Sequence, residues 1–181
     1  MTGADAAPSE AAAPEPGLPR RMASFLYEGV LLFGVVFITG YLYSTLTGQR
    51  HALQGQTGLQ VVVFLVLGLY FVTFWSKGGQ TVALRAWQLR VVDARGEPLK
   101  PARATARFLA SWLWFAPALV TARLAGLHGA GQIFTLLSVG VIAYALLTRL
   151  HPQRQFLHDA LCGTRLVRWQ PGPARRAQSG R

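Results

Sequence analysis

The chain has 181 residues, which is the length of one domain. Hydrophobic residues make up 51% of it and charged residues only 14%, against about 25% in soluble domains, so the composition favours a membrane protein. The formal net charge of +11 would also suit a nucleic-acid partner, but the basic residues lie in blocks that flank apolar runs. This distribution argues against nucleic-acid binding. With one cysteine, Cys162, no intramolecular disulfide can form.

Four apolar runs organise the chain, at residues 22–43, 59–75, 108–124 and 133–150. A helix of about 17 to 25 apolar residues crosses the hydrocarbon core of a bilayer. We therefore expect an all-α membrane protein with four transmembrane helices arranged as two hairpins. Pro117 should kink the third run. That run is weaker than the first, so a re-entrant or interfacial path stays open for it.

Both ends of the chain lack apolar periodicity. Residues 1–19 are rich in Ala, Pro, Glu and Gly, and residues 170–181 are rich in Pro, Arg and Gly. Such compositions are typical of disordered tails. The expected organisation is an N-terminal tail at 1–19, a transmembrane domain at 20–169 and a basic C-terminal tail at 170–181.

A basic polar segment, residues 76–107, separates the two predicted hairpins. Within it, residues 81–89 are expected to form a short surface helix and residues 89–92 have strand character. After the last apolar run, residues 155–162 suit a short helix ended by Gly163, and residues 164–169 suit a strand. If the two strands pair, they form a short cytoplasmic β-like element.

The distribution of positive charge predicts the orientation. All but two of the 18 Lys and Arg residues, Arg50 and Arg123, fall on one side of the four predicted spans. Cytoplasmic loops of membrane proteins carry the excess of Lys and Arg. We therefore expect a multi-pass membrane protein with both termini and the basic segment in the cytoplasm.

Glu28 is the acidic residue that lies inside a predicted span. A charged side chain at that depth is unfavourable by a few kcal/mol, so it should face protein or water instead of lipid. Arg21 precedes it by seven residues, on the same helical face. Glu28 is either a cation or proton site or one half of an ion pair with a residue such as Arg107 or Arg154.

Asp159 follows His158 near the predicted cytoplasmic face. It could join Glu28 and Arg21 in one polar cluster, or it could cap a short helix or neutralise Arg154 or Arg165. In the first case the ligand or ion pathway consists of Arg21, Glu28 and Asp159, with Arg107, Arg154 and His158 as supporting polar residues.

Enzymatic chemistry has no positive support in the sequence. The four histidines lie outside the middle of the spans, and His151 and His158 lack the Cys or acidic partners of a metal site. No Ser or Cys nucleophile has a recognisable setting. We expect neither catalytic activity, nor a cofactor, nor a bound metal.

Three segments together resemble a known family: RRMASFLYEGVL at the start of the first run, GQTVALRAWQLRVVDARGEPL in the basic segment and RQFLHDALCGTRLV near the end. Over residues 19–169 the chain resembles the RDD family of bacterial membrane proteins. That family is named for one arginine and two aspartates, and transport has been proposed for it.

The resemblance implies that Arg21 stands at the family's arginine and Asp159 at its second aspartate. Glu28 stands at the place of the first aspartate, which keeps the charge and lengthens the side chain by one methylene. A tight aspartate site would be altered by that change. The resemblance also implies that the three positions form one constellation.

Two functions follow from these expectations. The first is transport of a cation, a proton or a small ligand through the polar cluster around the first helix. The second is a non-catalytic membrane scaffold or assembly partner that acts through its basic cytoplasmic face. The expected partners are the lipid bilayer and either a second copy of the chain or another membrane protein.

Overall fold

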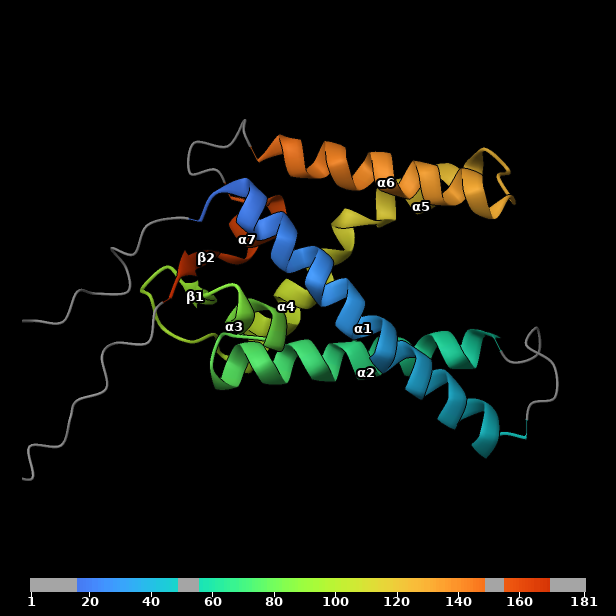
Figure 1. The fold of residues 1–181 in the computed structure, drawn as a ribbon, viewed down its shortest axis with the longest axis horizontal. Coiled ribbons are helices and arrows are strands. Elements are labelled where there is room, and N and C mark those ends of the chain that lie inside the picture. The colour runs from blue at the N-terminus through green and yellow to red at the C-terminus, as the bar shows by residue number, and fades with distance from the viewer. Residues whose placement is uncertain (1–15, 49–55, 149–154, 170–181) are drawn as a thin grey trace, which may run out of the picture.

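The fold was obtained as a computed structural model that describes residues 16–48, 56–148 and 155–169 (Figure 1). The tails predicted at 1–19 and 170–181 lie almost wholly outside these residues, although the first helix already begins at Leu18. The elements in chain order are α1 (Leu18–Leu46), α2 (Gln56–Lys77), α3 (Val82–Ala86), β1 (Leu89–Asp93), α4 (Pro101–Ser111), the 3₁₀ turn η2 (Trp112–Trp114), α5 (Ala116–Leu124), α6 (Ala130–Leu147), α7 (Leu157–Cys162) and β2 (Thr164–Arg168).

Three of the described helices, α1, α2 and α6, are long and apolar enough to cross a membrane. They correspond to the first, second and fourth apolar runs. The multi-pass, mainly helical character is therefore confirmed, together with a small sheet. The prediction of a fourth span is not confirmed, because the third run is divided between α4, η2 and α5.

The third run breaks before the proline that was expected to kink it. Pro117 lies in the first turn of α5, where its missing N–H leaves no helical hydrogen bond unmade. The break itself is η2, which carries the buried Trp114 into a cluster of aromatic rings. The ring centroids of Tyr144 and Phe156 lie 4.6 and 4.9 Å from that of Trp114. Burial of a large aromatic side chain thus accompanies the interruption of the helix.

The short elements gather at one end of the molecule. Figure 1 shows β1, β2, α3 and α7 beside the start of α1 and the end of α2, whereas the link from α5 to α6 lies at the other end. This arrangement is the one expected of two hairpins whose connecting segment and described termini share a side. The direction of that side relative to the cell stays a prediction.

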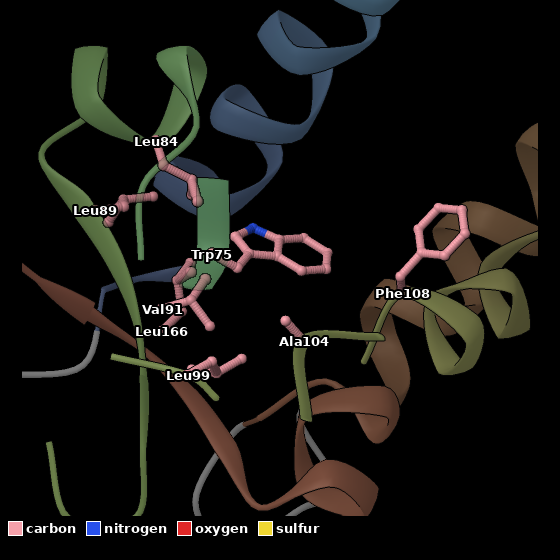
Figure 2. Packing of buried hydrophobic residues seen from close by; sticks show 8 residues of the cluster. All are labelled: Trp75, Leu84, Leu89, Val91, Leu99, Ala104, Phe108 and Leu166. Carbon is pink, nitrogen blue, oxygen red and sulfur yellow. The ribbon is translucent and has the colours of Figure 1, made fainter. Parts of the chain in front are cut away.

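The predicted pairing of the two strands is confirmed. β1 and β2 are antiparallel, with Val91 opposite Leu166 and Leu89 opposite Arg168. Leu89 and Val91 are fully buried. Figure 2 shows them grouped with Trp75 from the end of α2, and the same hydrophobic cluster includes Ala104 of α4. The sheet therefore buries one face against the ends of the helices.

A tight turn after α2 joins the sheet to the helices. The backbone N–H of Val91 donates to the carbonyl oxygen of Gly79 at 2.7 Å, and the side chain of Gln80 donates to the carbonyl oxygen of Leu89 at 2.7 Å. Gly79 has a φ of +69°, and a Cβ atom there would overlap the carbonyl oxygen of Val91. Glycine is therefore required at this position.

Replacement of Gly79 by alanine should lower the unfolding free energy by about 2 kcal/mol or more, because alanine is strained at positive φ and its Cβ displaces the strand. Thermal unfolding of the protein in nanodiscs measures the effect. Gly78→Ala is the matched control, since open space surrounds that position. Equal melting temperatures for the two variants would contradict this account of the turn.

Candidate functional site

A cavity of about 320 Å³ lies where α1, α2, α4 and α7 meet. Five of the six residues predicted for the polar cluster line it: Arg21, Glu28, Arg107, His158 and Asp159. The sixth, Arg154, lies outside the described residues. Apolar and aromatic side chains form most of the remaining wall. Residues that are far apart in the sequence thus meet around one cavity.

Glu28 is buried and its carboxylate accepts hydrogen bonds from two hydroxyl groups. The hydroxyl of Tyr70 on α2 donates to Oε1 at 2.7 Å, and the hydroxyl of Thr81 donates to Oε2. Thr81 is also the N-cap of α3, since its oxygen accepts the backbone N–H of Leu84. Glu28 therefore connects α1 to α2 and to the start of α3. In the described part of the chain, no ion pair with Arg107 satisfies it.

Asp159 forms the buried ion pair of the site. The Nε atom of Arg107 donates to its Oδ1 atom at 2.7 Å, and the two side chains are 7% and 2% exposed. The hydroxyl of Thr164 donates to the same oxygen at 2.9 Å. Burial by itself would raise the pKa of Asp159, but the Arg107 charge and these donated hydrogen bonds hold that pKa below its usual value.

This pairing differs from two of the alternatives considered for Asp159, and the third, neutralisation of Arg154, falls outside the described residues. The N-cap of α7 is Phe156, and Asp159 lies further along the first turn of that helix. The Nε and Nη2 atoms of Arg165 are buried and have no hydrogen-bond partner among the described residues. The charge of Asp159 is thus neutralised by Arg107 on α4. Asp159 neither caps α7 nor binds Arg165, six positions further along the chain.

The guanidinium of Arg107 also packs on an aromatic ring. Its Cζ atom lies 4.2 Å from the ring centroid of Trp75, at the end of α2. A cation over an indole face is attracted by the ring's negative charge density, and the attraction grows when both groups are buried. Arg107 therefore joins α4 to α2 through Trp75 and to α7 through Asp159.

His158 extends the polar cluster towards α6. Its Nδ1 atom lies 3.0 Å from the hydroxyl of Tyr144, which also accepts the backbone N–H of His158 at 2.9 Å. Its Nε2 atom lies 3.7 Å from Oδ2 of Asp159. Burial lowers the pKa of His158 to about 4, although the adjacent carboxylate opposes the shift. The imidazole is therefore neutral near pH 7.

Arg21 lies in the first turn of α1 and lines the same cavity. Its Nε atom donates to the carbonyl oxygen of Pro16 at 2.9 Å, and its guanidinium lies 5.6 Å from the ring centroid of Phe156. The side chain is 5% exposed. The structure thus brings Arg21, Glu28 and Asp159 to one cavity, as the resemblance implied, while giving each a different set of partners.

Sequence reasoning missed the hydroxyl groups that hold the carboxylates. Thr81 could have been found, because it belongs to the GQT motif on which the family resemblance rests. Tyr70 could also have been found, because it carries a hydroxyl group within an apolar run. Thr164 and Tyr144 gave no comparable signal. In the described ranges, no group of three or more His, Cys, Asp or Glu side chains is placed to hold a metal ion. The expected lack of a cofactor stays a prediction.

The stability of the fold should fall as the pH is lowered from about 6.5 to about 4. In this interval the unfolded chain protonates His158 while the folded chain keeps it neutral, so unfolding takes up a proton. The loss amounts to about 3 kcal/mol. The depressed pKa of Asp159 contributes nothing here, because its stabilising effect is lost only below the usual carboxyl range.

Thermal unfolding at several pH values measures this dependence. His158→Gln should flatten it, and replacement of the exposed His128 by glutamine should leave it unchanged. An equally steep dependence in His158→Gln would show that another group is responsible.

Of the comparisons with known proteins, one gives a match. The profile of the RDD family matches residues 15–163, which include α1 to α7 and end just before β2. No curated protein and no solved structure gives a match. The matched segment contains all three positions implied by the resemblance, namely Arg21, Glu28 and Asp159. Since it covers most of the 181 residues, the chain belongs to the RDD family.

Proposed function

We propose that this multi-pass membrane protein transports a small ligand or ion, with the cavity between α1, α2, α4 and α7 as the binding site. The observation that carries the proposal is the meeting of Arg21, Glu28 and Asp159 around that cavity. Buried ionisable residues in membrane proteins are a sign of ion or substrate pathways. The protein performs no covalent chemistry in this proposal.

Glu28 is the group that we assign to proton or cation movement. Both of its oxygens accept hydrogen bonds, one from Tyr70 on α2 and one from the N-cap Thr81 of α3. A proton on the carboxyl group turns one of these acceptors into a donor, so the hydroxyl at that oxygen must either accept instead of donate or lose the contact. Protonation of Glu28 would in this way change how α1 is held against α3. Such a link between charge and packing is what a coupled transporter needs.

We place the end that carries the sheet in the cytoplasm of a bacterial cell, with the spans in the inner membrane. Exposed Arg85, Arg95 and Arg103 support this orientation, because they lie at that end of the molecule. The sheet would then form a cap beneath the membrane, next to the cavity.

Glu28→Gln should abolish transport that is driven by a pH or cation gradient in proteoliposomes, because the amide cannot carry the proton or charge. Glu97→Gln is the matched control: it makes the same change at an exposed residue outside the cavity, so it should retain the flux. Transport by Glu28→Gln at the rate of the parent would refute the role of Glu28.

A second candidate function is a membrane scaffold. The exposed basic residues at the end of the molecule that carries the sheet favour this function. Arg85 and Arg95 are exposed, and Trp87 beside them is 37% exposed. Arg90 differs from them, since its Nε atom donates to the carbonyl oxygen of Gly78 at 3.1 Å. An acidic surface on a membrane protein or on a second copy of the chain would complement the exposed arginines.

If the chain is a scaffold, the double charge reversal Arg85→Glu with Arg95→Glu should abolish co-purification of a specific partner, and Glu28→Gln should leave co-purification intact. Arg123→Glu, an exposed arginine at the other end of the molecule, is the control. Absence of any specific partner with the parent protein would count against the scaffold.

A further inference from the structure

The two carboxylates of the cavity already have their hydrogen-bond donors. Asp159 accepts from Arg107 and Thr164, and Glu28 accepts from Tyr70 and Thr81. A cationic ligand would have to compete with these donors and, at Asp159, with the positive charge of Arg107, which is unfavourable. The polar groups that remain for a ligand are of the opposite kind.

Within the described ranges, two sets of N–H donors in the wall have no identified acceptor, the terminal nitrogens of Arg107 and the indole nitrogen of Trp75. Among the described residues Asp159 alone is hydrogen-bonded to Arg107, and it takes Nε, so the terminal guanidinium nitrogens are left without a bond there. The indole Nε1 atom of Trp75 is buried and also has no partner in the described part of the chain. Figure 2 shows this ring projecting from the end of α2, with its nitrogen on the edge that faces α1.

One head group can serve both donors. The Arg107 guanidinium lies 4.2 Å from the Trp75 ring centroid, so its terminal nitrogens and the indole N–H belong to the same corner of the cavity. A carboxylate has two oxygens and is the natural partner of a planar guanidinium. A buried indole N–H without an acceptor is unfavourable, and a bound carboxylate would satisfy that of Trp75.

The rest of the wall suits an apolar body. Seven Phe and Trp residues line the cavity outside the polar corner: Phe25, Phe71, Phe108, Trp112, Trp114, Phe115 and Phe156. Its volume of about 320 Å³ lies at the lower end of the range for small-molecule sites. An inorganic ion would leave these rings without contacts, whereas a two-chain lipid exceeds the space.

We propose that the cavity binds a small organic acid, with its carboxylate on Arg107 and Trp75 and its apolar body against the aromatic wall. This assignment rests on the proposed function, since it names the ligand class of the same cavity. Two arginines and two carboxylates line the cavity, so a bound anion together with a proton on Glu28 leaves it neutral. Transport of the acid would then be coupled to that of a proton.

The test compares three probes of one shape in nanodiscs of neutral lipid: naphthoate, naphthylmethanol and naphthylmethyl-trimethylammonium. Equilibrium dialysis against the full chain gives the three dissociation constants, and empty nanodiscs correct for partition into lipid. Naphthoate should bind at least tenfold more tightly than the other two, because only it accepts charge-assisted hydrogen bonds. Equal or tighter binding of the cation or the alcohol would overturn the assignment.

Trp75→Phe removes the indole N–H and keeps an aromatic ring. It should weaken naphthoate binding about tenfold and change naphthylmethanol binding less than twofold. Trp87→Phe, outside the cavity, should change neither. Arg107→Lys keeps the charge and loses the planar fork, so it should also reduce the preference for the anion. Unchanged preference in both Trp75→Phe and Arg107→Lys would refute the site.

The outcomes separate this inference from the proposed function. If no probe binds the parent protein, the assignment to a small organic acid fails, and the flux measured with Glu28→Gln decides the proposed function. If the probes bind without preference for the anion, the cavity is a ligand site and only the assigned ligand class is wrong. If phosphatidylglycerol in the nanodisc displaces naphthoate, a lipid head group occupies the site and the assignment to a small acid is overturned.

Discussion

The buried ion pair between Arg107 and Asp159 is the interaction on which the rest of the structure depends. Its 2.7 Å contact joins α4 to α7, two helices that lie 52 positions apart along the chain at these residues. Removing both charges from water is strongly unfavourable, and the pair is tolerable because Thr164 and the face of Trp75 complete its surroundings. Loss of either partner would leave a buried charge without compensation. The pair therefore fixes where the cap meets the helices.

The cavity follows from that placement. With α4 and α7 held together, Phe108 on α4 faces α2, and the ring of Trp114 on η2 packs within the aromatic cluster that includes Phe156. The turn at Gly79 then brings Thr81 to Glu28, so that the cap is fastened to α1 as well. A polar network that spans several elements gives each charged group a partner while leaving an apolar space beside it. This combination is what makes the site suitable for a ligand with one charged end.

Much of this fold was predictable from local pattern. Hydropathy located α1, α2 and α6, and the strand character of residues 89–92 and 164–169 predicted the pairing of β1 with β2. The break at η2 was not predictable, because it depends on the packing of Trp114 against rings from distant segments. Pro117 drew attention to the wrong point of the third apolar run, because proline is also well tolerated in the first turn of a helix.

The candidate site, like the fold, was predictable from the sequence only in part. Arg21, Glu28 and Asp159 could be selected from the sequence because charges near apolar runs are rare and because the resemblance grouped them. Which charge pairs with which is a property of the packed structure, so the choice of Arg107 for Asp159 and of two hydroxyls for Glu28 was beyond the sequence.

A double-mutant cycle on Arg107 and Asp159 tests this account most directly. Arg107→Met, Asp159→Leu and the double variant would be unfolded in nanodiscs under identical conditions. We predict that each single variant loses about 3 kcal/mol or more, and that the double variant loses less than the sum by at least about 2 kcal/mol. Losses that add to within about 0.5 kcal/mol would show that the two residues act independently, and would contradict the central role of the pair.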